Sequence, residues 1–159
     1  MTLPAHKQAY TISTHVSDAV LREMLGYHIK RASNVIQADL AQTLQAFDLR
    51  MITYTALVLI AENPGLSQAK LADAMAVERP NLVVIVDELE KRGLIMRNRV
   101  PEDRRAYALT TTLAGRQLFE KATKSVRQHE ERLLTPLTAE LRAAVIEAMS
   151  LIRQQSAET

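Results

Sequence analysis

Four arginines lie close together near the middle of this sequence and have the chemistry to bind phosphate: Arg97, Arg99, Arg104 and Arg105. Residues 94–99 and 106–110 alternate between apolar and polar side chains, which predicts two β-strands joined by a proline-containing loop. Such an arginine-bearing hairpin can enter the minor groove of DNA, whose negative potential attracts guanidinium groups. The alternative is a solvated hairpin whose arginines only pair with nearby acids, chiefly Asp103.

A predicted helix pair precedes this hairpin. Residues 68–75 and 79–92 have helical periodicity, and a turn of three residues separates them. The second helix has a proline in its first turn, a glycine directly after it, and one apolar stripe: Leu82, Ile85, Val86 and Leu89. Two helices joined in this way form a helix-turn-helix, whose second helix usually reads the major groove.

Polar residues begin both helices. Arg79 and Asn81 can meet base edges or phosphates, because guanidinium pairs with guanine and carboxamide with adenine. The alternative for both is ordinary surface at a helix start. Ser67 and Gln68 can contact a backbone phosphate through the N-terminus of the first helix, although Ser67 can equally be a plain helix cap.

Val83 and Val84 lie outside the apolar stripe of the second helix. They can contact thymine methyl groups, or they can pack under the hairpin, and the sequence leaves both open. The two valines also keep open a different function. In that alternative the chain is a winged-helix dimer that acts as a protein-interaction module and does not read DNA.

Several segments resemble one protein family in order and spacing: residues 66–72 (LSQAKLA), 87–95 (DELEKRGLI), 103–105 (DRR) and 112–116 (TLAGR). The chain is similar to the MarR family, which are dimeric winged helix-turn-helix transcriptional regulators, from about Leu25 to the C-terminal helix. The resemblance implies that Arg105 enters the minor groove and that Asp103 holds the hairpin tip in shape. The sequence departs from the family pattern at Val83 and Val84, and at Thr111.

The resemblance also implies a small-molecule pocket where the first, second and fifth helices meet. The residues that the sequence offers there are Tyr27, His28, Arg31, Met51 and Tyr54. Guanidinium, imidazole and phenol groups among apolar walls suit a small aromatic carboxylate or its thioester. Alternatively, Arg31 forms an interfacial ion pair and His28 is a satisfied core residue.

Composition excludes several classes of protein. The chain has no cysteine, which rules out disulfides and thiolate sites, and its four histidines are too scattered in sequence to predict a metal site. We find no catalytic motif and predict neither enzyme activity nor a cofactor. No signal sequence or membrane span is apparent, so we expect a cytoplasmic protein.

Between Arg79 and Arg116, eight basic residues face five acidic ones, although the whole chain carries only +2. This local excess of positive charge favours a polyanionic partner at this segment.

The predicted fold is mainly α, with six helices and a two-stranded β-wing. Residues 1–15 are expected to form a flexible arm, residues 16–47 and 113–159 a helical dimerisation region, and residues 48–112 the DNA-binding region. The first helix is expected to run from Ser17, as its N-cap, to about Phe47. The terminal helices carry more apolar surface than a monomer can cover, so we expect a homodimer rather than a monomer. Its two reading helices would meet a pseudo-palindromic operator in double-stranded DNA.

Overall fold

The computed structural model describes residues 16–100 and 103–155, and for residues 100 and 103–106 it describes the backbone alone. The predicted arm, residues 1–15, lies outside the described residues. Contacts divide the chain into two compact units, residues 1–34 and 35–159, which are considered separately below. No helix in the described part is both long and apolar enough to cross a membrane.

The first unit corrects one prediction. Instead of one helix from Ser17, a 3-10 helix (η1, Leu21–Glu23) is followed by α1 (Leu25–Gln45), with Met24 extended between them at φ −101° and ψ 122°. Ser17 does not cap the helix; its hydroxyl accepts a long 3.5 Å hydrogen bond from the Ala19 amide. The chain breaks here because the side chains around Asp18 bond to one another across the interruption, as described below. At its other end α1 stops before Phe47.

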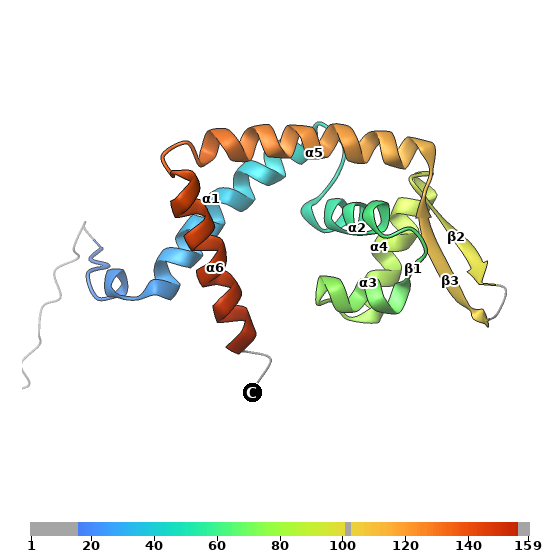
Figure 1. Ribbon diagram of the computed structural model, residues 1–159, viewed down its shortest axis with the longest axis horizontal. Helices are drawn as coiled ribbons and strands as arrows, with labels where there is room; N and C mark the ends of the chain where they lie inside the picture. Colours follow the sequence, from blue (N-terminus) through green and yellow to red (C-terminus); the bar gives the residue numbers. More distant parts are fainter. Residues whose placement is uncertain (1–15, 101–102, 156–159) are drawn as a thin grey trace, which may run out of the picture. The chain divides into compact units, whose positions relative to one another are not determined.

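Helix α2 (Met51–Glu62) is the centre of the second unit (Figure 1). Its residues Ala56, Leu57 and Ile60 have no exposed surface. They belong to one core with buried side chains of α3, α4, β3 and α5. The helix begins after a corner at Asp48, whose φ is +52°, and the turn after it places Gly65 at φ +91°.

The predicted helix pair is present as α3 (Gln68–Met75) and α4 (Arg79–Lys91). The Ser67 hydroxyl accepts a 3.3 Å hydrogen bond from the Lys70 amide, so Ser67 is the N-cap of α3. Ala76 adopts a left-handed conformation in the turn between the helices. The apolar stripe predicted for the second helix is buried.

The wing contains one strand more than predicted. Strands β2 (Ile95–Val100) and β3 (Asp103–Thr111) form the expected hairpin, and β1 (Leu66–Ser67) pairs with the other edge of β3, giving the antiparallel order β1-β3-β2. A strand of two residues has no periodicity that a sequence could reveal. The predicted loop was also too long: Val100 pairs with Asp103, so Arg104 and Arg105 lie in β3 and not in the loop.

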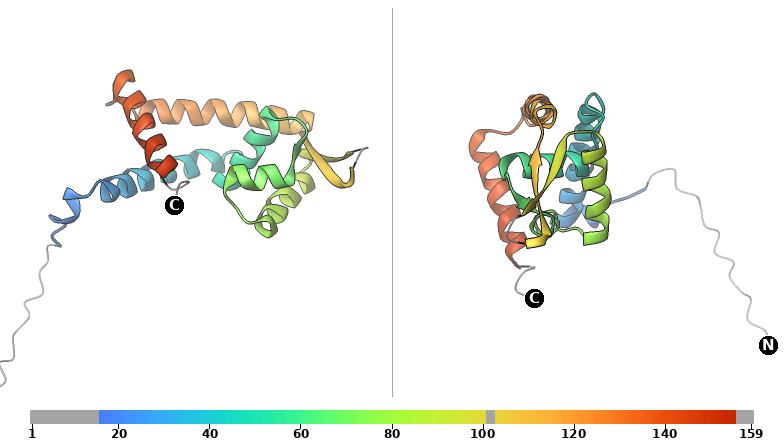
Figure 2. Two further views of the ribbon diagram at one scale, coloured as in Figure 1. Left: turned by 60° about the horizontal axis from the view of Figure 1, so that its bottom comes forward. Right: turned by 90° about the vertical axis from the view of Figure 1, so that its right-hand side faces the viewer.

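Two further helices complete the six α-helices of the described residues: α5 (Leu113–Leu133) and α6 (Ala139–Gln155). Helix α5, seen end-on in the right-hand view of Figure 2, packs on α2. Thr112 caps α5 by accepting a 3.0 Å hydrogen bond from the Gly115 amide, and Thr138 accepts one of 3.3 Å from the Leu141 amide. Helix α6 has no buried residue.

Candidate nucleic-acid interface

The outward face of α4 carries most of the residues predicted to read bases. Because Leu82, Ile85, Val86 and Leu89 fix the opposite face in the core, Arg79 and Asn81 are exposed at the start of the helix. The side chains of Val83 and Val84 are also exposed, to 44% and 64%. Neither valine is therefore packed away under the wing.

A surface hollow of about 460 Å³ lies beside this face, between the starts of α3 and α4 and strand β3. It brings together four of the predicted DNA-contacting residues: Ser67, Gln68, Arg79 and Val83. Its wall also includes Tyr107 of β3, which the sequence reasoning missed. Tyr107 lies in one of the alternating segments, and only the folding of β3 beside α3 identifies its neighbours.

The wing arginines differ in their surroundings. Arg99 is exposed, whereas the side chain of Arg97 is only 18% exposed and its guanidinium pairs with both Asp87 and Glu90 of α4. Burial opposes the charge of Arg97, but the two carboxylates outweigh it and raise the pKa of the guanidinium. Arg97 therefore braces β2 against α4. The DNA contact predicted for it stays a prediction. The side chains of Asp103, Arg104 and Arg105 lie outside the described residues.

The acidic residues of α4 are all compensated by arginines. Besides the pairs of Arg97 with Asp87 and Glu90, Glu88 pairs with Arg50 at the start of α2. Unpaired carboxylates on a reading helix would repel the phosphates of DNA. The pairs remove much of that penalty and at the same time fix α4 to its neighbours.

Arg92 holds the C-terminal end of α4. Its guanidinium donates hydrogen bonds of 2.6 Å to the carbonyl of Asp48 and 3.3 Å to that of Phe47, both in the corner before α2. These bonds satisfy two carbonyls of the corner between α1 and α2. The reading helix is thus fixed by side-chain bonds at its C-terminal end as well as by its buried stripe.

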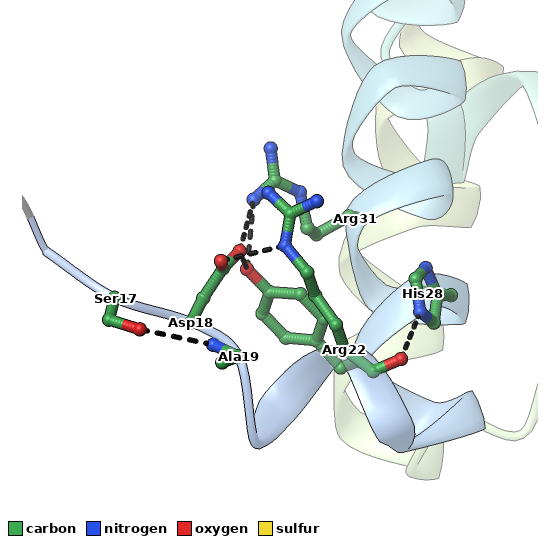
Figure 3. A network of polar contacts seen from close by, with 7 residues as sticks. Ser17, Asp18, Ala19, Arg22, His28 and Arg31 are labelled. Carbon is green, nitrogen blue, oxygen red and sulfur yellow. Dashed lines mark hydrogen bonds and ion pairs between the residues drawn. The ribbon is translucent and has the colours of Figure 1, made fainter.

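Three predicted ligand residues lie in the first unit (Figure 3). The Tyr27 hydroxyl donates to a carboxylate oxygen of Asp18 at 2.7 Å and accepts from the Arg31 guanidinium at 2.8 Å. His28 Nε2 lies 2.8 Å from the Arg22 carbonyl, and its side chain is exposed, so His28 is not a core residue in this chain. Arg31 has an intramolecular partner in Asp18, at 3.7 Å.

The other two predicted ligand residues belong to the second unit. Met51 is 42% exposed at the start of α2, and the Tyr54 hydroxyl lies 3.2 Å from that of Thr123 on α5. The second unit also contains an apolar pocket of about 90 Å³ between α1 and α5 that the sequence did not predict. His129 lies at this pocket, where its Nδ1 is 3.5 Å from Oδ1 of Asp39. The described residues contain no cluster of three or more metal-ligand side chains.

Comparisons with known proteins agree on one class of protein. The model of the MarR family matches residues 50–107. A protein named for transcriptional regulation of the hcr operon in Thauera aromatica is 34% identical over 136 residues, covering 85% of this chain and 82% of that protein. The transcriptional repressor CouR bound to a 23-mer DNA duplex is similar with a TM-score of 0.83 and 34% identity, covering 88% of this chain and 99% of CouR. CouR from Rhodococcus jostii RHA1 bound to p-coumaroyl-CoA gives a TM-score of 0.77 at 28% identity, covering 86% and 95%.

Proposed function

This chain belongs to the MarR family of winged-helix transcriptional regulators, and from that premise we propose that it is a homodimeric repressor released from its operator by a small aromatic or acidic effector. The observation that carries the proposal is the outward face of α4 with the hollow beside it. Exposed Arg79 and Val83 line this hollow together with Ser67 and Gln68. Asn81 and Val84 are exposed on the same helix, and the acids of that helix are paired. This face offers groups for both bases and phosphates.

Exposed apolar side chains support the proposed homodimer. On α6, Ile146 is 67% exposed and Leu151 is 57% exposed, and on α1 the exposed fraction of Val35 is 57%. Helical apolar faces of this size are usually covered, and a second copy of the chain presents matching faces. A two-fold dimer would place its reading helices about 34–36 Å apart, one turn of DNA, so we expect a pseudo-palindromic operator.

The effector is proposed from the relatives and from the residues available here. CouR has been solved with p-coumaroyl-CoA, an aromatic acyl thioester. We assign Tyr27, His28, Arg31, Met51 and Tyr54 to effector binding in this chain. The effector acts by binding more tightly to a conformation whose two reading helices no longer match successive major grooves.

Fluorescence anisotropy with DNA from upstream of the chain's own coding region tests the proposal. Wild-type protein should bind this DNA more tightly than random DNA, and Arg105→Ala should weaken binding and lower the dependence of log K on log salt by about one. Arg127→Ala, on α5 outside the winged helix, is the control and should bind as wild type does. Equal binding by Arg105→Ala and wild type would contradict the role of the wing. Addition of p-coumaroyl-CoA should release the specific DNA.

A further inference from the structure

A carboxylate of the chain itself occupies a cationic cluster at the start of α1. One oxygen of Asp18 accepts a 2.7 Å hydrogen bond from Nε of Arg22, and the other accepts the 2.7 Å bond from the Tyr27 hydroxyl. Arg31 lies 3.7 Å from that second oxygen and donates to the same hydroxyl. Figure 3 shows the Asp18 carboxylate beside the guanidinium groups of Arg22 and Arg31, with a dashed line to each. The cluster therefore already binds one anion, contributed by residue 18.

The two arginines retain binding capacity beyond Asp18. The side chains of Arg22 and Arg31 are 66% and 64% exposed, whereas that of Asp18 is 25% exposed. Asp18 bonds only Nε of Arg22 and lies near only Nη1 of Arg31, so other donors of both guanidinium groups have no partner among the described residues. Within the cluster, the two positive charges of Arg22 and Arg31 face the one negative charge of Asp18. An external anion can thus be attracted to the cluster.

We propose that Arg22, Tyr27 and Arg31 form a binding site for a phosphate group of the effector, and that Asp18 is a competitor built into that site. Two guanidinium groups match the charge and the several oxygens of a phosphate dianion better than those of a single carboxylate. The phenol of Tyr27, which Asp18 and Arg31 now share, is a further donor. The inference rests on the proposed function, because it assigns part of an effector to a named set of residues.

Displacement of Asp18 has a structural consequence. Exposed ion pairs contribute little stability, so an incoming phosphate can replace the carboxylate without a large penalty. Asp18 precedes η1, whereas Tyr27 and Arg31 belong to α1, and the bonds of Asp18 join these two segments. An effector phosphate would therefore release residues 16–20 from α1, while Arg22 would keep η1 joined to α1 through the phosphate. Effector binding and the order of this segment become coupled.

Isothermal titration calorimetry of the full-length chain at low salt tests the inference, with coenzyme A as the probe that carries phosphates but no acyl group. Asp18→Asn, which removes the competing charge and preserves the shape, should bind coenzyme A about tenfold more tightly than wild type. Arg31→Met should abolish binding, alone and combined with Asp18→Asn. Asp39→Asn is the matched control, because Asp39, on α1, is another partly exposed aspartate with an ion-pair partner, His129, and its loss should change nothing.

Each remaining result decides the inference. Equal binding by Asp18→Asn and wild type, or undiminished binding by Arg31→Met, would overturn it. If Asp18→Asn binds p-coumarate more tightly than wild type does, but does not bind coenzyme A more tightly, the site takes a carboxylate. That result would overturn the phosphate assignment. Thermal melts confirm that each variant is folded. If p-coumaroyl-CoA fails to release DNA from the wild type, the proposed function fails by itself, because the calorimetry contains no DNA.

Discussion

Arg97 on wing strand β2 forms an ion pair with Asp87 on the reading helix, and the same guanidinium also pairs with Glu90 one turn further along. Its Nε is buried and has no partner among the described residues, so the group is held by its two carboxylates alone. The contact joins the two elements that are expected to enter different grooves of DNA. Arg97 therefore helps to set the angle between wing and reading helix, together with the buried Leu94 and Ile95 at the start of the wing.

Replacing Arg97 should impair both folding and DNA binding. Arg97→Met leaves Asp87 and Glu90 without their partner, and we expect it to lower the free energy of unfolding by about 2 kcal/mol, less than for a fully buried pair because both carboxylates are partly exposed. Hydroxyl-radical footprinting should show loss of protection in the minor groove. Arg142→Met breaks the ion pair with Glu131 in the C-terminal region and should leave that footprint unchanged. An intact footprint in Arg97→Met would refute the brace.

The exposed valines of α4 should read thymine methyl groups. Val84→Ala should leave stability within about 0.5 kcal/mol of wild type, because Val84 is on the surface. Wild-type protein should bind an operator less tightly when deoxyuridine, which lacks the methyl group, replaces the contacted thymines. Val84→Ala should not distinguish the two operators. If wild-type protein binds neither operator, even at low salt, the valines belong to a protein-interaction surface.

The backbone of Leu94 approaches Gly115 so closely that a side chain at this position would clash with it. A Cβ at this position would lie 1.8 Å from the carbonyl oxygen of Leu94, so Gly115→Ala must push α5 away from the start of the wing. We expect a loss of about 3 kcal/mol, at the upper end for overpacked sites, measured by urea denaturation. Gly26→Ala is the control: no atom lies within 4 Å of its added Cβ, and a better helix former should stabilise α1 slightly. Equal stabilities for the two variants would contradict the packing described here.

The hydrogen bonds of the Asp18 cluster should be visible in the pH titration of the Asp18 carboxyl group. Hydrogen bonds from Arg22 and then Tyr27 lower the pKa of the Asp18 carboxyl from 3.8 to about 2. Since the folded pKa is the lower one, the stabilising contacts are complete above the ordinary pKa and are lost as the pH falls through about 2. Carboxyl NMR should give a midpoint near 2 in wild type and a higher one in Arg22→Gln. An ordinary midpoint in wild type would mean that the cluster does not form in solution.

The elements that the sequence predicted well are those with local signals. Helix α3 has the predicted bounds, residues 68–75, because Ser67 caps its start. The break at Met24 depends instead on the bonds of Asp18, one of which reaches nine residues along the chain to Tyr27. No helical period contains that information. Strand β1 was missed because its partner, β3, lies some forty residues away.

The sequence indicated which residues belong to the candidate site, but it did not indicate which of them hold the fold together and which are exposed to a partner. Arg97 and Arg99 look alike in sequence, and only the packing of β2 on α4 distinguishes the brace from the exposed arginine. His129 and Asp39 are ninety residues apart and meet only because α1 and α5 are adjacent. The type of each side chain indicated which chemistry it could do. Contacts between segments far apart in the sequence decide which of those side chains are free to bind DNA or a ligand.

Strand β1 makes the wing and α3 mechanically continuous. Leu66 and Ser67 pair with Leu109 and Ala108 of β3, and α3 begins at the very next residue. The hairpin therefore cannot tilt without moving the start of α3, which we propose faces the DNA phosphates. A DNA duplex whose minor groove has the wrong width would consequently lose its contacts with the wing and with the start of α3 at the same time. We therefore expect the protein to select DNA by the width of its minor groove as well as by its base sequence.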